Sequence, residues 1–365
     1  MTARILTGLD FVSARLHARR SRLAEGERLD TLCRIRAIPE LARAVLSDTA
    51  IQTAVDLQRR MTAEQVRELV ELRRNLEGAA ENYLDWLCVR FQVENLKVLA
   101  RGFVNRTPIK DLRPHLVPLP AEYSLDEAAL AAADSVEVFA QGIPHKPLAE
   151  AVRGIAGIYE EQPRPFFIEA ALDMGYFLEA LERTERLSGE DRETVLPLLL
   201  HEADVFHVML VVRGKFQYGL KPETLIRFHI RGTGIGRDRL ADMLSAPDIA
   251  SVGRRGDRWR GLGEQSGGGD ITDPAILETL ALNRYLRLAD SMFRRSHMGF
   301  GAVVGYLGVR RVELANLITL SEGIRMAAPP EAIRLRLVPR TDLSGMPAVG
   351  SPRREPGRRG EVSRV

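Results

Sequence analysis

Cysteine is scarce in this chain of 365 residues, which contains only Cys33 and Cys88. So few cysteines exclude a disulfide framework and indicate two small buried apolar residues, or alternatively a redox pair. Long apolar runs are also missing. The best one, Gly301 to Val309, is about half of the roughly 18 to 20 residues that a membrane helix needs, and no apolar segment follows the Arg-rich N-terminus as in a secretory signal. We therefore expect a cytosolic chain without a membrane-spanning helix.

Strand-like alternation of apolar and polar residues is absent, which predicts an almost entirely α-helical protein. Lysine is rare, so arginine supplies most of the positive charge. The 52 basic and 49 acidic residues leave a net charge of +3. The segment after residue 339 alone carries this excess, and the rest of the chain is balanced. A nucleic-acid-binding protein concentrates basic charge on one face, so we expect no nucleic-acid partner.

What the sequence does contain is one motif written three times. Its copies run Gln92-Val-Glu-Asn95 to Arg101-Gly102, Asp204-Val-Phe-His207 to Arg213-Gly214, and Glu313-Leu-Ala-Asn316 to Glu322-Gly323. The glycines are 112 and 109 residues apart (214 − 102 and 323 − 214). A proline-containing loop follows each glycine and leads to an acidic residue, which is Asp111, Glu223 or Glu331. Self-similarity at a fixed spacing indicates a repeat architecture.

Within each copy, two polar residues precede the glycine by ten and seven positions. A spacing of three places both on one face of a helix. We predict that the glycine ends this helix in a left-handed conformation, and that the proline and the acid begin a short second helix. Because the polar pair recurs in every copy, we interpret it as structural, bonding backbone or arginine groups of a neighbouring helix. A partner-binding role is the alternative.

The motif divides the chain into three predicted helical units, at residues 1–118, 119–232 and 233–339, followed by a disordered basic tail at 340–365. Thr62 matches a capping box and predicts the start of one very long helix, or two in line, that ends at Gly102. Ser188 is expected to cap the helix that ends at Gly214, where Pro197 marks a kink or the true start. Further helices are predicted at 10–36, 39–46, 124–134, 147–161, 165–186, 238–244 and 273–294, with a polar loop at 253–270.

Three stretches resemble sites of chemistry. His201-Glu202 and His207 resemble a zinc-protease helix, but a spacing of six points the two imidazoles to different sides. The stretch 232–236 lacks the Lys-Ser/Thr of a phosphate loop, and 299–305 resembles a dinucleotide fingerprint without a sheet around it. We interpret the histidines as core or interface residues and both glycine-rich stretches as turns or close helix crossings. No catalytic, cofactor-binding or metal-binding residue is predicted.

The three-copy pattern, with its Arg-rich opening helix, resembles the C subunit of the A/V-type rotary ATPases, the counterpart of the eukaryotic d subunit. The third copy carries the most specific match, which reads Gly305-Tyr306-Leu, then Glu313-Leu-Ala-Asn316-Leu, Gly323 and Pro330-Glu331-Ala-Ile333. The resemblance covers about residues 9–339. Three residues depart from the family pattern: His207 replaces asparagine, Gln92 replaces an acid and Glu322 replaces arginine.

This resemblance implies an all-α fold of three similar helical bundles arranged as a pseudo-three-fold funnel. It implies a non-catalytic, monomeric rotor subunit on the cytoplasmic face of the membrane, without a cofactor. Its partners would be the central-shaft subunits, whose foot enters the funnel, and the membrane proteolipid ring, so that the protein passes torque between ATP chemistry and H⁺ or Na⁺ flow. Two alternatives stay open: an unrelated α-helical repeat scaffold that binds a partner peptide or helix in a groove, and an α-helical metalloenzyme.

Overall fold

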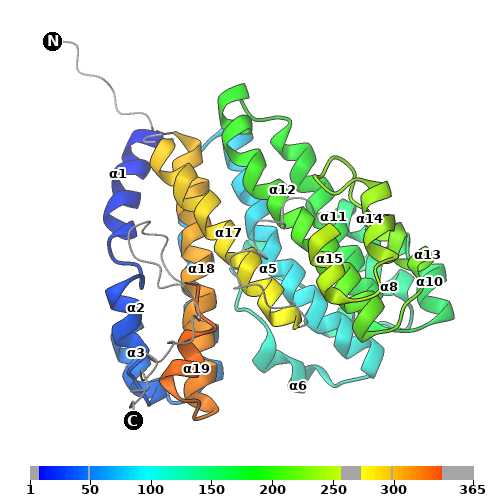
Figure 1. Ribbon diagram of the computed structural model, residues 1–365, viewed down its shortest axis with the longest axis horizontal. Helices are drawn as coiled ribbons and strands as arrows, with labels where there is room; N and C mark the ends of the chain where they lie inside the picture. The colour runs from blue at the N-terminus through cyan, green and yellow to red at the C-terminus, as the bar shows by residue number, and fades with distance from the viewer. Residues whose placement is uncertain (1–7, 48–49, 256–272, 297–298, 339–365) are drawn as a thin grey trace, which may run out of the picture.

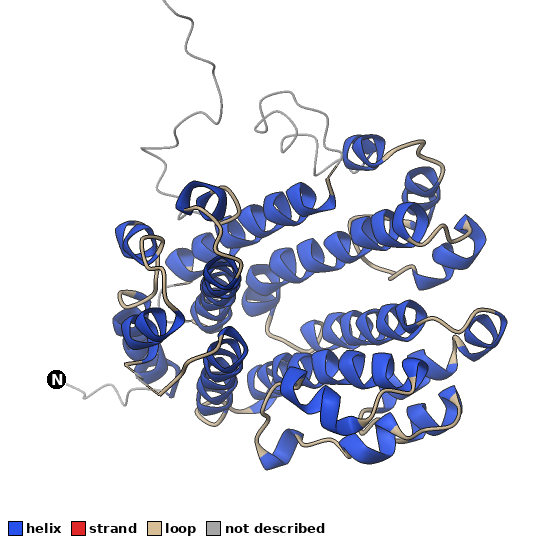
Figure 2. Cartoon of the chain, turned by 90° about the horizontal axis from the view of Figure 1, so that it is seen from below, coloured by secondary structure: helices blue, strands red, loops and turns tan. Residues whose placement is uncertain are grey.

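Three pairs of long helices dominate the computed structural model, which describes residues 8–47, 50–255, 273–296 and 299–338. Helices are the only regular structure in these residues, as Figure 2 shows, so the all-α prediction is confirmed. The pairs, called hairpins below, are α4 (Ala54–Arg73) with α5 (Gly78–Asn105), α11 (Pro165–Thr184) with α12 (Gly189–Val211), and α17 (Pro274–Arg295) with α18 (Phe300–Arg325). The predicted tail and most of the polar loop lie outside the described residues.

Along the chain, short helices precede, connect and follow the hairpins (Figure 1). They are α1 (Gly8–Arg20), α2 (Glu27–Leu32), α3 (Ile38–Leu46), α6 (Ile109–Leu112), η1 (Arg113–His115), η2 (Ala121–Tyr123), α7 (Glu127–Ala131), α8 (Val136–Gln141), α9 (Lys146–Arg153), α10 (Ala156–Glu161), η3 (Val212–Gln217), α13 (Pro222–Leu225), η4 (Ile226–Phe228), α14 (Arg237–Leu244), α15 (Ile249–Arg255) and α19 (Pro330–Arg334). The predicted stretch at 124–134 therefore contains only the short helix α7, and the stretch at 147–161 is divided into α9 and α10.

The first hairpin folds back on itself, so neither one long helix nor two helices in line is present. The chain turns at residues 74–77. Gly78 follows this turn with φ 66°, a conformation that glycine adopts without side-chain strain. An ion pair of 2.8 Å between Arg73 and Asp85 then joins the two helices. The sequence pattern predicts both α4 and α5, but it does not predict that the chain reverses direction between them.

The cap of α4 is Thr53 rather than Thr62. Thr53 Oγ1 accepts the backbone N–H of Asp56 at 3.1 Å. Thr62 lies inside the helix, where its hydroxyl donates to a carbonyl oxygen of the preceding turn. The capping-box prediction is therefore wrong, because the same residue pattern also occurs within a helix. Ser188 does cap α12 as predicted, with its Oγ accepting an N–H of the first turn at 3.2 Å.

The motif glycines do not end their helices, so that prediction is wrong. Gly102 and Gly323 lie inside α5 and α18, and Gly214 lies in the π-helical continuation of α12, η3. Positive φ values occur a few residues later, at Arg106 (54°), Gly219 (64°) and Ala327 (51°). The helix stop is thus separate from the glycine in all three copies.

A close approach explains the glycines instead. The short helix after each motif packs one branched side chain onto the glycine, pairing Gly102 with Leu112, Gly214 with Leu225 and Gly323 with Ile333. A Cβ at Gly214 or Gly323 would lie 2.5 Å from a methyl group of its partner. That separation is far inside van der Waals contact, so a side chain at either position would force Leu225 or Ile333 to move from its place on the long helix.

Each hairpin packs on the next: α5 lies against α11, α12 against α17, and α18 against α4. The residue before the motif glycine contacts the fifth residue of the following first helix in every case. The three pairs are Arg101 with Glu169 (2.6 Å), Arg213 with Glu278 (2.5 Å), and Gln58 Nε2 with Glu322 (2.7 Å). The third pair is a hydrogen bond rather than a salt bridge, and it connects the last hairpin to the first.

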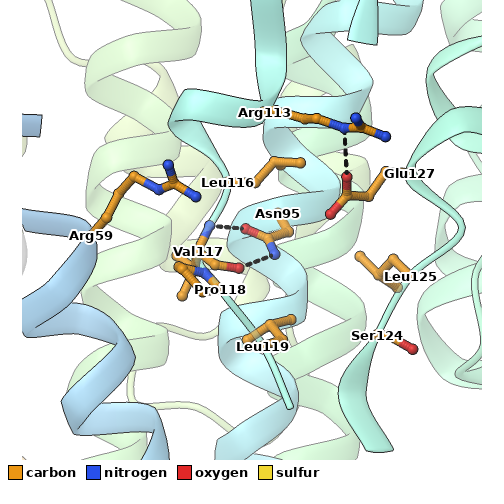
Figure 3. Close-up of a pocket in the computed structure, with 10 residues that line it drawn as sticks. All are labelled: Arg59, Asn95, Arg113, Leu116, Val117, Pro118, Leu119, Ser124, Leu125 and Glu127. Atoms are coloured by element: carbon orange, nitrogen blue, oxygen red, sulfur yellow. Dashed lines mark hydrogen bonds and ion pairs between the residues drawn. The ribbon is translucent and has the colours of Figure 1, made fainter. Parts of the chain in front are cut away.

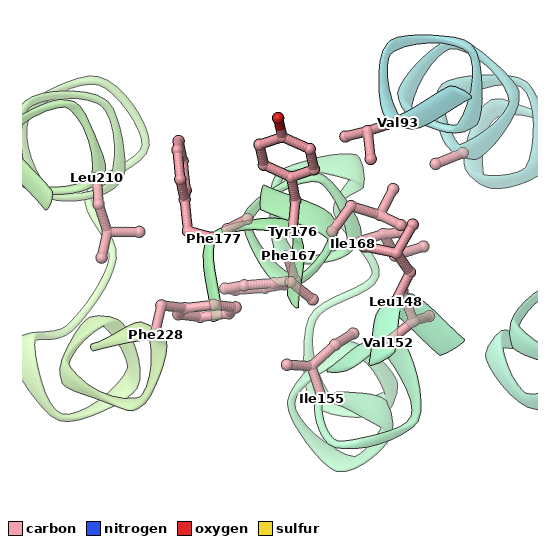
Figure 4. Packing of buried hydrophobic residues seen from close by; sticks show 14 of the residues in the cluster. Val93, Leu148, Val152, Ile155, Phe167, Ile168, Tyr176, Phe177, Leu210 and Phe228 are labelled. Atoms are coloured by element: carbon pink, nitrogen blue, oxygen red, sulfur yellow. The ribbon is translucent and has the colours of Figure 1, made fainter. Parts of the chain in front are cut away.

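The largest core cluster surrounds α11 in the second block of the chain (Figure 4). Phe167 stacks on Phe228 with ring centroids 6.3 Å apart and planes 7° apart. Tyr176 meets Phe177 edge to face at 5.4 Å. Buried residues of α8, α9 and η4 belong to the same cluster. These apolar contacts hold the short helices of this block against α11.

One helix, Gly189–Gln217, is long and apolar enough to cross a membrane by length and composition alone. The expectation that no segment reaches this level is therefore wrong on composition. In the structure, 61% of the apolar window is buried inside the protein. The helix packs against both α11 and α17, and Pro197 lies within it without ending it. Burial against these neighbours accounts for its apolar residues.

Candidate functional site

The asparagine of the motif binds the backbone of the segment that follows the short helix. Asn95 Nδ2 donates to the carbonyl oxygen of Val117 (2.9 Å), and its Oδ1 accepts the N–H of the same residue (2.7 Å). Asn316 makes the same two bonds to Val338, both 2.9 Å long. Both asparagines are buried. Each amide therefore satisfies the donor and the acceptor of one backbone residue, an arrangement that we call the clamp.

His207 replaces this amide in the second copy and makes half of the contact. Its Nε2 accepts the N–H of Ile230 at 2.9 Å, whereas its Nδ1 is buried without a hydrogen-bond partner. Thr233 donates to the carbonyl oxygen of Ile230 instead. Burial, with a smaller contribution from His229, lowers the pKa of His207 to about 3. The second clamp thus requires the neutral imidazole, because a protonated Nε2 cannot accept.

The other polar residue of the motif binds the chain further along. The three contacts are Gln92 Nε2 with the carbonyl oxygen of Tyr123 (2.9 Å), Asp204 Oδ1 with the N–H of Ile235 (2.9 Å), and Glu313 Oε1 with the N–H of Ala24 (2.5 Å). In the first two copies the partner belongs to the segment that leads into the next unit. In the third copy the partner lies between α1 and α2, so the N-terminal segment takes the equivalent place.

Replacing Asn316 by alanine is expected to lower the free energy of unfolding by about 2 kcal/mol, because the N–H and carbonyl of Val338 both lose a buried partner. The matched control is Asn82→Ala at an exposed position near the start of α5, with an expected change below about 0.5 kcal/mol. Chemical unfolding of the two variants measures the difference. Similar losses in both variants would contradict the clamp.

Replacing His207 by asparagine is expected to flatten the pH dependence of stability. The unfolded chain protonates His207 below the ordinary pKa of 6.5, whereas the folded chain resists protonation down to about 3. The unfolded state therefore binds more protons in this window, and stability falls as the pH falls. At pH 5 the loss relative to pH 7.5 is about 2 kcal/mol. Chemical unfolding at both pH values tests this, and an undiminished loss in the variant would refute it.

Three charged side chains from the three second helices meet at one point. Arg90 of α5 and Arg311 of α18 both donate to Glu202 Oε2 of α12, at 2.5 and 2.6 Å. All three lie twelve residues before a motif glycine (102 − 90, 214 − 202 and 323 − 311). The rings of Tyr176 and Tyr285 lie under the two guanidinium groups at 5.8 and 5.0 Å. We call Arg90, Glu202 and Arg311 the central triad.

The electrostatics of the central triad keep all three groups charged. Burial alone would raise the pKa of Glu202, but the guanidinium groups of Arg311 and Arg90 hold it at about 2. The carboxylate in turn raises the pKa of both arginines despite their burial. Charges withdrawn from water are stable only while their partners stay in place. The triad therefore fixes the positions of α5, α12 and α18 relative to one another.

From the triad toward the motif glycines, each second helix carries a stripe of partly exposed side chains. Steps of four, three and four residues keep the stripe on one side of a helix. This shared face comprises Arg90, Glu94, Lys97 and Arg101 on α5, Glu202, Phe206, Met209 and Arg213 on α12, and Arg311, Ala315, Ile318 and Glu322 on α18. Side-chain exposure rises from 14–33% in the triad to 37–54% beside the glycines. The shared face is thus closed at the triad and open to solvent beyond it.

The opposite ends of the second helices converge. Tyr83 of α5 and Phe300 of α18 meet edge to face with ring centroids 6.0 Å apart. Gly301 of α18 lies so close to Thr194 of α12 that a Cβ there would overlap the threonine methyl group. The three helices therefore pack against one another at their N-terminal ends and through the triad, and the shared face becomes exposed toward the motif glycines.

Between the triad and the residues beside the glycines, the shared face is charged on α5 and apolar on α12 and α18. On α5, Lys97 forms ion pairs with Glu94 (3.2 Å) and with Asp173 of α11 (2.7 Å). On α12 and α18 the same level is apolar, with Phe206, Met209 and Ile318 partly exposed. A helical partner with one charged and one apolar side would match this surface. Charged contacts at such a surface set specificity and association rate more than affinity.

The stretches that resembled enzyme sites have structural roles. His201 Nε2 bonds the carbonyl oxygen of Ala281 at 2.9 Å, while His207 bonds Ile230, so the two histidines face different neighbours. The stretch 232–236 supplies the N–H of Ile235 that Asp204 accepts. In the stretch 299–305, helix α18 crosses α17 closely at Gly305. Among the residues that the structure describes, no group of three or more His, Cys, Asp or Glu could hold a metal.

Two members of the site, Arg90 and Arg311, were not predicted from the sequence, and Glu202 was considered only beside its histidine neighbour. Their common distance from the motif glycines is the signal that could have identified them. Cys33 and Cys88 are both buried and free. Burial raises the pKa of the Cys88 thiol to about 12, so this side chain is an inert apolar residue, as expected.

Comparison with known proteins identifies the family of this chain. Residues 12–336 match the family model described as ATP synthase (C/AC39) subunit. The C subunit of the A-type ATP synthase of Methanothermobacter thermautotrophicus is 24% identical over 88% of this chain and 86% of the relative. That of Methanocaldococcus jannaschii is 23% identical over 90% and 86%. The C subunit of the V-type ATP synthase of Deinococcus radiodurans is 26% identical over 89% of each chain. The match over nearly all of the described helices shows that the chain belongs to the ATP synthase C/AC39 subunit family, as the sequence resemblance predicted.

Proposed function

We propose that this protein is a non-catalytic rotor subunit in the central stalk of a V/A-type ATPase or ATP synthase. It links the central shaft to the membrane proteolipid ring and transmits torque for ATP-coupled H⁺ or Na⁺ transport. It acts as a single copy within the complex, bound peripherally at the cytoplasmic face of the membrane. The names of its relatives, which are C subunits of A-type and V-type ATP synthases, support this role.

The shared face is the observation that carries the proposal. Equivalent positions of three helices meet at the triad and are exposed beyond it, and in the proposed funnel an elongated partner on its axis would contact all three. The foot of a helical shaft has this form. The funnel and its three units, 1–118, 119–232 and 233–339, are part of the proposal, supported by the equivalent packing of each hairpin on the next.

Torque transmission requires a rigid body. Each hairpin is joined to the next through its second helix, and α18 contacts α4, so load on one hairpin passes to both others. The triad, the clamps and the glycine contacts are all short and mostly buried. Interiors packed in this way transmit displacement rather than absorb it.

Removing the protein should separate the two activities of the complex. Membrane vesicles that lack this chain are expected to retain ATP hydrolysis by the soluble sector and to lose ATP-driven ion pumping. Re-addition of the purified protein is the control and should restore pumping. Unchanged pumping without the chain would overturn the proposal. The purified chain alone is expected to hydrolyse no nucleotide, and robust ATPase activity of the isolated chain would also contradict it.

Of the two alternatives from the sequence, the unrelated scaffold loses its basis. A helical scaffold unrelated to rotary ATPases does not agree with a family match over residues 12–336. A helical metalloenzyme finds no ligand set in the described part of the chain.

A further inference from the structure

The clamp holds each second helix on one side and leaves a different side chain on the other. In the close-up of the pocket beside the first clamp (Figure 3), the amide of Asn95 is bonded at both ends to Val117. Lys97 follows two residues later, and a step of two residues turns a helix by about 200°, to its opposite side. The same step separates two further pairs, His207 with Met209 and Asn316 with Ile318. Each clamp therefore fixes, from behind, a helix that carries one residue of the shared face in front.

Each of these face residues is on a helix that packs on the next hairpin. The fifth residue of the neighbouring first helix contacts the stripe beside the glycine. Because a step of four residues stays on one face of a helix, the ninth residue lies one turn further along the same junction. We call these three junctions the seats. They are Lys97 with Asp173 (first seat), Met209 with Leu282 (second seat) and Ile318 with Thr62 (third seat), all partly exposed.

The first seat is ionic. Lys97 Nζ lies 2.7 Å from Asp173 and 3.2 Å from Glu94. Burial alone would lower the pKa of Lys97, but the carboxylates of Asp173 and Glu94 raise it, so the amine stays charged. One turn toward the glycine, Arg101 pairs with Glu169 at 2.6 Å. Three carboxylates and two cations therefore give this side of the shared face one negative charge in excess.

The second and third seats carry no charge. Met209 packs against the largest core cluster, and Ile318 packs against the cluster around α3 and α4. One turn toward the triad, α12 has Phe206, whose ring lies 6.0 Å from that of Phe177. The equivalent residue of α5 is Glu94. Two neighbouring seats thus offer apolar contact, and the first seat offers paired charges at the same level.

We propose that the three seats accept the foot of the central shaft in one orientation only, with its basic side at the first seat and its apolar side at the second and third. This inference rests on the proposed rotor role. Turning the foot by one seat would press apolar surface onto the ion pair of Lys97 and remove its water without replacement, and would place basic groups against Met209 without a partner. Three identical seats would accept three orientations equally. Unequal seats select one, so the shaft does not slip between equivalent positions under torque.

Photo-cross-linking in the assembled complex tests the orientation. Ala315→Cys places a labelled thiol on the shared face of α18 with little change in size, and the natural cysteines are 1% exposed. Mass spectrometry of the linked peptides identifies the residues of the shaft subunit that face position 315. We expect residues from one apolar side of the foot, captured at least about tenfold more often than residues from its other sides.

A second variant tests whether the seats set this preference. Lys97→Met with Asp173→Leu gives the first seat the residues of the second, and apolar replacement of a buried ion pair is often neutral for folding, which circular dichroism checks. Capture from position 315 is then expected to spread to a second side of the foot. The control Lys146→Met, at a lysine that is 83% exposed on α9, should keep the original pattern.

Three results would contradict the inference or its basis. Equal capture from all sides of the foot by Ala315→Cys alone would mean that the shaft has no single orientation, even if the double variant fails to fold. An unchanged preference in the folded double variant would show that the seats do not set it. Failure to capture any shaft subunit would instead contradict the rotor role itself.

Discussion

Replacing Glu202 by alanine is expected to lower the free energy of unfolding by about 3 kcal/mol. The change removes the carboxylate that accepts from both Arg90 and Arg311. Two guanidinium groups would then face each other, largely withdrawn from water, without a counter-charge. Breaking one partner out of a buried ionic group is far more costly than losing an exposed pair. Chemical unfolding followed by circular dichroism measures the loss.

The matched control for this prediction is Glu182→Ala. Glu182 pairs with Arg186 at an exposed position of α11, 63% of its side chain being accessible, so the expected change is below about 0.5 kcal/mol. Glu202→Gln should show a pH signature as well. The folded pKa of Glu202 lies at about 2, below the ordinary 4.5, so its stabilising contribution is complete above pH 4.5 and is lost as the pH falls toward 2. A difference between wild type and Glu202→Gln that persists unchanged at pH 2 would contradict the triad.

Replacing Gly305 by alanine is expected to destabilise the protein by about 3 kcal/mol. A Cβ at this position would lie 2.5 Å from the backbone nitrogen of Phe293 and 2.7 Å from the carbonyl oxygen of Ala289. Both atoms belong to the backbone of α17, so no side-chain rotation relieves the overlap. Helices α17 and α18 would have to separate, which opens the core between them. Thermal or chemical unfolding of the variant provides the measurement.

Gly189→Ala is the control for this overlap, because nothing lies within 4 Å of a Cβ there and Gly189 begins a helix. Its stability should equal or slightly exceed that of the wild type, since alanine favours the helix. If both glycine variants had the same stability, the close crossing of α17 and α18 would be refuted.

The sequence predicted many elements of the fold but few of the tertiary contacts that explain them. The triple motif, the helical class and the cap at Ser188 could be read because each depends on residues near one another in the chain. The role of Gly102 could not, since its cause is Leu112 in a separate helix. A glycine followed by a loop has the same pattern whether it ends a helix or receives a neighbour. The local pattern therefore identified Gly102 as important but predicted the wrong structural role for it.

The central triad was hidden for a related reason. Arg90, Glu202 and Arg311 differ in charge, so comparison of the three copies by residue type does not reveal them. Their equivalence appears only when position is counted from the glycine and the three helices are brought together. The backbone partners of the clamp could not be predicted from the sequence either. Asn95 could be recognised as a buried polar group, but its binding to the backbone of Val117 depends on the path of the loop.

The apolar composition of α12 has its cause in packing. Residues 189–217 are long and apolar enough for a membrane helix. They are apolar because α11 and α17 pack against them and exclude water. The sequence of an apolar helix does not show whether its neighbours are lipids or other helices of the same protein. The charged and polar residues within the same helix, such as Glu202 and Asp204, make defined bonds to other elements, which a lipid-exposed helix would lack.

Cross-linking from the shared face tests the central claim most directly. The natural cysteines are buried, at 1% exposure each, so Met209→Cys supplies a single accessible thiol on the shared face and Glu182→Cys a matched one on the outer surface of α11. In the assembled complex, a photo-cross-linker on residue 209 is expected to capture a central-shaft subunit, and one on residue 182 is not. Capture from neither position, or equal capture from both, would contradict a rotor subunit that holds its shaft against α5, α12 and α18.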